Sequence, residues 1–145
     1  MNMLQRNLIT VVCVANYCRS PVAEVILKNK YQARFEIISA GISPMPEPNM
    51  DQRSLKYLKD YQYDFAFHNP RKLSKRIIMS SSLILAMDHY VLEYLNRNYK
   101  NYVQKFKMIN FQHPNISTKD PYKYNDEDYN EVMNNIKKIC EEIDI

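Results

Sequence analysis

The chain has 145 residues and carries 20 Lys and Arg against 16 Asp and Glu, which gives a formal net charge of +4. This length fits a single domain, residues 1–145, that can bury a hydrophobic core without disulfides or a structural metal. The mild positive charge is spread along the chain, so it suits an acidic or phosphorylated partner and gives no indication of nucleic acid binding.

Strand-like and helix-like segments alternate along the sequence. Apolar, partly β-branched runs predict buried strands at residues 8–14, 35–40 and 83–87 and a weaker one at 103–109. Helices are predicted to begin at Ser20-Pro21, at Asp51 and at Asp88, with a short helical turn near 73–77 and a final helix over about 126–143. In this final helix, apolar residues recur every three or four positions, and Cys140 lies on that stripe as an expected core residue.

This alternation predicts an α/β fold: a doubly wound sheet of four parallel strands with helices on both faces. Ligands of such sheets bind beyond the carboxyl ends of the strands. The loop after the first strand is therefore the first place to look for a site.

The three cysteines, Cys13, Cys18 and Cys140, argue against a secreted protein. Their odd number and spacing do not fit a disulfide framework, and Cys13 and Cys18 lack the second ligand pair of a zinc site. The apolar run 8–15 resembles the core of a signal peptide, but no small-x-small cleavage site follows it. No segment approaches the roughly 18 apolar residues that span a bilayer. We therefore expect a cytoplasmic protein with no zinc site and no membrane contact.

The first loop reads Cys13-Val-Ala-Asn-Tyr-Cys-Arg19-Ser20-Pro21. Backbone N–H groups at the start of the following helix, together with the helix dipole, favour an anion there. Arg19 adds a planar fork of donors for phosphate oxygens. The same field favours the thiolate form of Cys13, to which the Ser20 hydroxyl can donate. The pattern predicts a phosphate-binding loop that would hold phosphate or sulfate, although two buried cysteines beside a capped helix would also fit it.

Cys13-x5-Arg19-Ser20-Pro21, with Asn16 and Cys18 inside it, resembles the signature of the low-molecular-weight protein-tyrosine phosphatases. The likeness continues through Ser39-Ala40-Gly41, Asp51, His68, Met87-Asp88 and Asp120-Pro121-Tyr122, which follow one another in the family's order.

The resemblance implies a phosphatase that acts on tyrosine-phosphorylated proteins or peptides. Cys13 would form a phosphocysteine intermediate, and Arg19 would bind the phosphoryl oxygens. Asp120 would protonate the leaving tyrosyl oxygen and then activate water, so no metal or cofactor takes part. By itself, Asp120 before a proline would more simply be a turn residue.

The resemblance also assigns the neighbours of the nucleophile. Asn16 would adopt a left-handed conformation supported by Ser39 and His68. Cys18 would form a reversible disulfide with the nucleophile. Tyr122 would offer an aromatic wall to the substrate. The residues expected to contact substrate are Val14, Ala15, Asn16, Tyr17, Cys18, Ser20 and Tyr122, with Val14 and Tyr17 shaping the mouth.

Ala15 is the main departure, because the family usually has glycine at this position. A positive φ there would strain the loop and misdirect an amide. This motivates one alternative function, a catalytically weakened phosphotyrosine-binding module. Arsenate reductase is a second alternative, but no cysteine lies between Cys18 and Cys140 to form the thiol relay that this chemistry needs. A further departure is Ser82, where the family tends to carry an acidic residue.

Overall fold

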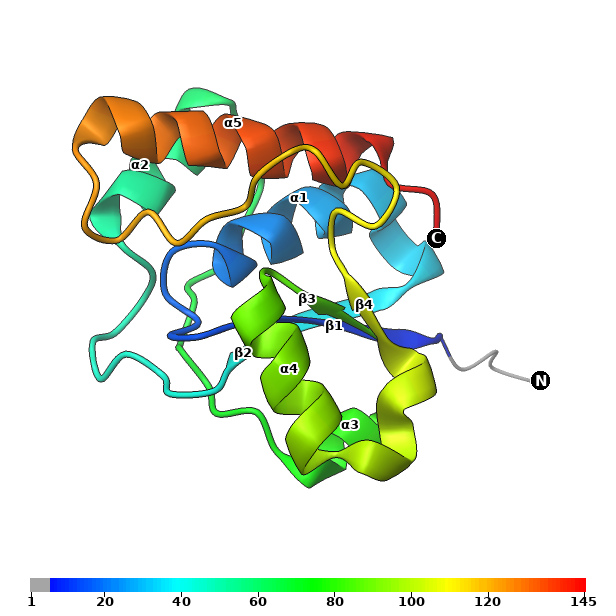
Figure 1. The fold of residues 1–145 in the computed structure, drawn as a ribbon. Coiled ribbons are helices and arrows are strands. Elements are labelled where there is room, and N and C mark those ends of the chain that lie inside the picture. Colours follow the sequence, from blue (N-terminus) through cyan, green and yellow to red (C-terminus); the bar gives the residue numbers. More distant parts are fainter. Residues whose placement is uncertain (1–5) are drawn as a thin grey trace.

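The computed structural model describes residues 6–145. Four parallel strands form one sheet in the order β2-β1-β3-β4 (Figure 1). The strands are β1 (Leu8–Cys13), β2 (Glu36–Gly41), β3 (Ser81–Ala86) and β4 (Phe106–Met108). This confirms the predicted fold class, and the first three strands lie within two residues of their predicted bounds.

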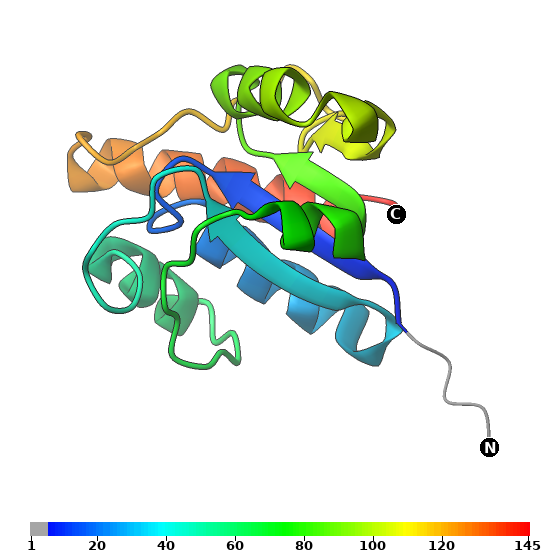
Figure 2. The same ribbon diagram turned by 90° about the horizontal axis from the view of Figure 1, so that it is seen from below.

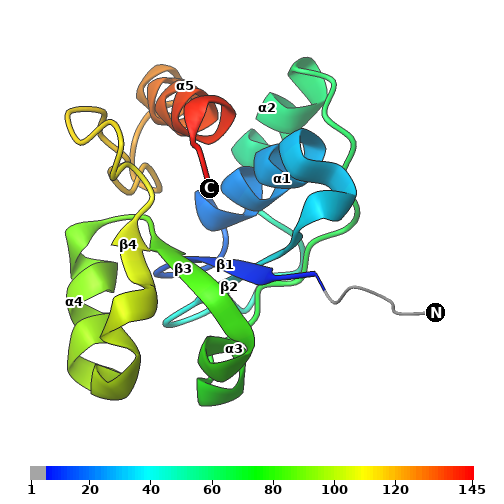
Figure 3. The same cartoon turned by 90° about the vertical axis from the view of Figure 1, so that its right-hand side faces the viewer.

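Helices cover both faces of the sheet, as a doubly wound fold requires (Figure 3). One face is covered by α1 (Ser20–Tyr31), α2 (Gln52–Asp60) and α5 (Asp126–Glu142), and the other by α3 (Lys75–Ser80) and α4 (His89–Asn98). Successive side chains of β1 point to opposite faces. Accordingly Val11 and Cys13 belong to the core beneath α1 and α5, whereas Val12 belongs to the core beneath α3 and α4.

The apolar stripe of α5 is buried along its whole length, as its spacing predicts. Tyr129, Met133, Ile136 and Cys140 are all inaccessible to solvent. Burial raises the pKa of the Cys140 thiol, so this cysteine is a protonated core residue at neutral pH. Among the helices of residues 6–145, none is both long and apolar enough to cross a bilayer.

The prediction for the fourth strand was wrong over most of its length. Only three residues pair with β3, and Lys100–Lys105 form a 3-10 helix, η2. Tyr99 and Tyr102 pack against the core at a spacing of three, which suits the three-residue turn of this helix, while Val103 is 46% exposed. Lys105 fastens the end of η2 by donating to the carbonyl of Ile78. A second 3-10 turn, η1 (Gln32–Arg34), follows α1.

Two of the predicted helix caps are confirmed and one is wrong. The carboxylates of Asp51 and Asp88 accept backbone N–H groups at the starts of α2 and α4. At the start of α1, however, Arg19 occupies the capping position and Ser20 is already helical. The Ser20 hydroxyl is instead hydrogen-bonded to Cys13 and Asn16 inside the loop.

The carboxyl ends of β1, β2 and β3 point to the same edge of the sheet (Figure 2). The loop 13–19 leaves β1 at this edge, and the loop 42–51 leaves β2 there. These loops build the candidate site, together with the segment that precedes α5.

Candidate functional site

Cys13 lies at the last position of β1, and its sulfur accepts two hydrogen bonds. The backbone N–H of Asn16 lies 3.2 Å from Sγ, and the Ser20 hydroxyl lies 2.9 Å from it. The Asn16 amide nitrogen donates to the same hydroxyl at 2.8 Å, which leaves the Ser20 proton free to point at sulfur. Two donors are therefore aimed at one sulfur.

Asn16 is buried in a left-handed conformation, with φ of 50°, and its side chain spans the loop. Its Nδ2 donates to the hydroxyls of Ser20 and Ser39, at 2.8 and 2.9 Å. Its Oδ1 accepts the backbone N–H of Arg71 at 2.9 Å. Because every polar atom of this side chain has a partner, the turn at Asn16 is held in one conformation.

The supports expected around Asn16 are both in contact with it. Nε2 of His68 lies 2.8 Å from the Asn16 carbonyl oxygen and donates to it. Burial lowers the pKa of His68, so the ring is neutral at pH 7. The Ser39 hydroxyl donates to Glu24 at 2.6 Å, which orients Ser39 toward Asn16. Glu24 was not predicted, because only the fold brings α1 beside this end of β2.

The single glycine of the chain, Gly41, lies directly beneath this loop. A Cβ at this position would come within 2.8 Å of the Val14 carbonyl oxygen and 2.9 Å of Asn16. Glycine is therefore required here because the loop approaches the β2 backbone so closely.

Ala15 does not have a positive φ. In residues 6–145 the positive-φ positions are Asn16, Gln32, Asn49 and Gln62. The left-handed turn falls on Asn16 alone, so the Cβ of Ala15 causes none of the backbone strain that was considered for it.

Arg19 is almost completely buried, with 2% of its surface exposed. Its Nη1 donates to the Asp88 carboxylate at 2.7 Å and to the Thr118 carbonyl at 3.0 Å. Burial opposes the charge, but the pKa of Arg19 is raised because the negative charges of Cys13 and Asp88 outweigh that effect. Since Nη1 is fully used, Nε and Nη2 remain for a ligand.

Asp88 was predicted only as a helix cap, yet it has two functions. One carboxylate oxygen caps α4, and the other binds Arg19. Its place directly after a buried strand was the signal that could have identified it as a site residue.

Asp120 is exposed, between the buried Thr118 and Pro121, and its segment reaches the loop from the last third of the chain. Its Oδ1 accepts the backbone N–H of Tyr122 at 3.1 Å, which closes a tight turn around Pro121. The Tyr122 ring, 47% exposed, meets the ring of Tyr17 edge-to-face with centroids 6.3 Å apart.

One cavity of about 100 Å³ unites these segments, and it is lined by Cys13, Ala15, Cys18, Arg19, Met45, Asp120 and Tyr122. Met45 was not predicted as a lining residue; it comes from the proline-rich loop after β2. Val14 does not line this cavity and instead packs against the core beneath α3 and α4. Across residues 6–145, His, Cys, Asp and Glu side chains form no cluster of three or more that could hold a metal.

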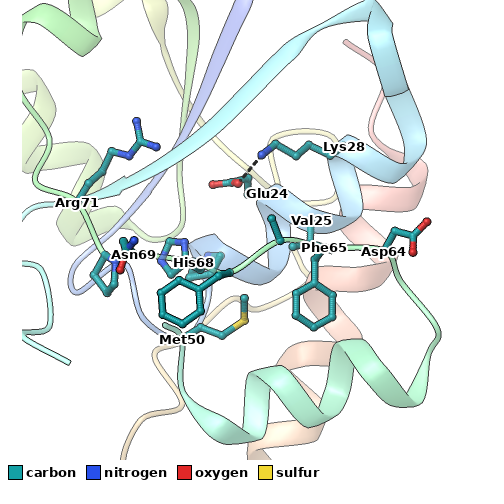
Figure 4. A pocket seen from close by; sticks show the side chains of 13 residues that line it. Glu24, Val25, Lys28, Met50, Asp64, Phe65, His68, Asn69 and Arg71 are labelled. Carbon is teal, nitrogen blue, oxygen red and sulfur yellow. Dashed lines mark hydrogen bonds and ion pairs between the residues drawn. The ribbon is translucent and has the colours of Figure 1, made fainter. Parts of the chain in front are cut away.

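A larger cavity of about 320 Å³ lies between α1 and residues 64–71, as Figure 4 shows. It is lined by Phe65, His68 and Arg71 among others, and Cys13 is not part of its wall. It is therefore separate from the smaller cavity, in which Cys13, Arg19 and Asp120 come together.

Cys18 has a different hydrogen-bond partner from those of Cys13. It is buried, and its thiol donates weakly to an Asp51 oxygen 3.8 Å away. Burial raises the pKa of Cys18 to about 12, so it is a protonated thiol at neutral pH. A disulfide between Cys18 and Cys13 stays a prediction; in the structure both are free thiols.

The protonation state of Cys18 can be tested by alkylation. In a Cys13→Ser variant treated with iodoacetamide at pH 7.5, we expect Cys18 and Cys140 to stay unmodified, because only thiolates react rapidly. Since the pKa of Cys18 is raised to about 12, its modification should increase only as the pH rises toward that value. Peptide mass spectrometry measures it, and the urea-unfolded protein is the control in which both cysteines react. Rapid labelling of native Cys18 at pH 7.5 would contradict the structure.

Comparison with known proteins agrees with this geometry. Residues 8–144 match the family described as low molecular weight phosphotyrosine protein phosphatase. The chain is 31% identical over 125 residues to the low molecular weight protein-tyrosine-phosphatase Ptp of Acinetobacter johnsonii, covering 86% of each chain.

Solved structures share the fold over nearly the whole chain. The structure of Vibrio vulnificus Wzb in complex with benzylphosphonate matches with a TM-score of 0.84 and 25% identity, covering 94% of this chain and 95% of that one. The YwlE arginine phosphatase of Geobacillus stearothermophilus matches with a TM-score of 0.82 and 23% identity, covering 92% and 88%, which establishes a common fold only. From the family match and the Acinetobacter relative, we conclude that this chain belongs to the low molecular weight phosphotyrosine protein phosphatase family.

Proposed function

We propose that this protein dephosphorylates phosphotyrosyl side chains with Cys13 as nucleophile, Arg19 as phosphate ligand and Asp120 as general acid. The observation that carries the proposal is the single cavity that these three residues line. This chemistry requires three groups: a thiolate that attacks phosphorus, an arginine with Nε and Nη2 available for phosphoryl oxygens, and a carboxyl group at the mouth of the cavity.

In the first step, Cys13 sulfur attacks phosphorus while the bond from phosphorus to the tyrosyl oxygen breaks. The Asp120 carboxyl group gives its proton to that oxygen, so the product leaves as tyrosine. In the second step, the Asp120 carboxylate takes a proton from water as the water oxygen attacks phosphorus. The S–P bond breaks, which releases phosphate and restores the thiolate. Arg19 and the loop amides stabilise the charge on the phosphoryl oxygens in both steps.

The shape of the cavity favours an aromatic substrate. Cys13 lies at its base with 2% exposure, so a phosphate must be carried on a long side chain to reach it. Tyr122 lines the cavity, and Tyr17 packs against the Tyr122 ring, so aromatic surface lies at the mouth for a phenyl ring. Because an arginine phosphatase shares the fold, the assays below should include phosphoarginine beside phosphotyrosine peptides. We place the reaction in the cytoplasm, where the three thiols, free in the structure, would stay reduced.

The first prediction of the proposed mechanism concerns the nucleophile. Cys13→Ser should abolish hydrolysis of p-nitrophenyl phosphate and phosphotyrosine peptides while leaving phosphate binding intact, because the loop amides and Arg19 remain. Steady-state kinetics measures turnover, and the rise in Tm with inorganic phosphate measures binding. Turnover comparable to that of the parent protein would contradict the mechanism.

The second prediction concerns the general acid. Asp120→Ala should lower kcat/KM for a phosphotyrosine peptide by roughly 10²–10⁴. The loss should be smaller for 2,4-dinitrophenyl phosphate, whose leaving group needs no proton. A series of aryl phosphates measures this dependence. Equal losses across the series would mean that Asp120 orders its segment and transfers no proton.

The third prediction concerns Ala15. Since its φ is not positive, Ala15→Gly should change kcat by less than about twofold, with no strain to relieve. The variant should instead be less stable by about 0.4–1 kcal/mol, because glycine loses more backbone entropy on folding. Kinetics and urea unfolding of the two proteins side by side give both values. A severalfold rise in kcat would show that alanine misdirects the loop.

A further inference from the structure

Arg53, on the first turn of α2, connects to the segment that carries Asp120. Its Nη1 donates to the backbone carbonyl of Tyr124 at 2.8 Å, and its Nη2 donates to that of Tyr122 at 2.9 Å. These carbonyls lie two and four residues beyond Asp120. Because one planar guanidinium donates to two carbonyls of this segment, it restricts both the position and the direction of the segment's backbone.

Arg53 is itself held in place. Its Nε and Nη2 donate to the two oxygens of Asp51, each at 3.1 Å. The guanidinium carbon lies 4.0 Å from the ring centroid of Tyr129 on α5. These contacts leave the Arg53 side chain little freedom, so it can act as a fixed anchor for the backbone it binds.

The same turn of α2 also contacts the phosphate-binding loop. The Asp51 N–H donates to the Tyr17 carbonyl at 2.9 Å, and the Ser54 hydroxyl donates to the Cys18 carbonyl at 2.9 Å. Asp51 and Arg53 therefore connect the segment that carries the nucleophile with the segment that carries the acid.

We propose that Arg53 is a positioning residue for proton transfer, keeping the Asp120 carboxyl group over the leaving oxygen by fixing the backbone at Tyr122 and Tyr124. The inference rests on the proposed function. Asp120 is exposed, and its carboxylate is engaged with the neighbouring Tyr122 N–H, so its placement depends on how that backbone is held. A displacement of about 1 Å can lower a rate on the order of 10²-fold.

The test compares Arg53→Met and Arg53→Lys on substrates with different leaving groups. For a phosphotyrosine peptide, kcat/KM of Arg53→Met should fall about 10- to 100-fold. For 2,4-dinitrophenyl phosphate, it should fall less than about threefold, since no proton is needed. Arg53→Lys keeps the charge beside Asp51 but cannot fork to two carbonyls, so it should show the same selective loss.

A double-mutant cycle shows whether the effect acts through the acid. In an Asp120→Ala background, adding Arg53→Met should change kcat/KM by less than about twofold, because the group to be positioned is gone. Lys56→Met is the matched control, since Lys56 lies on the same helix and pairs with Asp60, and it should leave both substrates unaffected. Urea unfolding establishes that each variant is folded.

Equal losses of Arg53→Met and Arg53→Lys on both substrates, or a loss that persists without Asp120, would overturn this inference and assign Arg53 a structural role. If Asp120→Ala shows the leaving-group dependence and neither Arg53 variant does, this inference alone is wrong. If Asp120→Ala also shows none, the proposed acid and this inference both fail.

Discussion

The left-handed turn at Asn16 is the constraint on which the rest of the site depends. A loop of this length can aim its amides at one phosphoryl group only if the chain reverses sharply between Cys13 and Arg19. Glycine could make that turn, but it would supply no side chain to hold it. Asn16 makes the turn, and its amide group then binds Ser20, Ser39 and the Arg71 backbone. The space for this arrangement comes from the missing Cβ of Gly41 in the neighbouring strand.

The buried charge of Arg19 also depends on contacts from other parts of the chain. Burying a guanidinium costs several kcal/mol unless its donors and its charge are satisfied. Asp88 and the Thr118 carbonyl satisfy Nη1, and Cys13 contributes an opposite charge nearby. One side of the guanidinium is therefore fixed by the protein before any substrate arrives. The remaining donors are thereby pre-organised for the phosphate that we propose Arg19 binds, so binding would not have to order a flexible side chain.

Local sequence patterns predicted three of the strands, the buried face of the last helix and two of the helix caps. The strands β1 to β3 and the stripe of α5 are long enough for their periodicity to be visible, and the caps at Asp51 and Asp88 follow from residue type. The edge strand β4 is too short to have such a pattern. The position of Asp88 after a buried strand marks it as a candidate site residue, but local sequence could not identify Arg19 as its partner, because the two residues lie 69 positions apart. The expectation that Cys13 and Asp120 share one site came from the family resemblance, because no local sequence pattern indicates it.

The segment that carries Asp120, the proposed acid, raises a different problem, because the mechanism needs a carboxyl group placed accurately on backbone that has no regular structure. Tertiary contacts on both sides of Asp120 solve it. Before it, the Thr118 carbonyl accepts from Arg19, and the Thr118 hydroxyl donates to the Met87 carbonyl at the end of β3. After it, Arg53 holds the carbonyls at Tyr122 and Tyr124. Arg19 and the turn of α2 that carries Arg53 both belong to the phosphate-binding half of the site. In the proposed mechanism, the acid is thus positioned relative to the nucleophile by the same groups that shape the phosphate site, which is how irregular backbone would place a proton donor accurately.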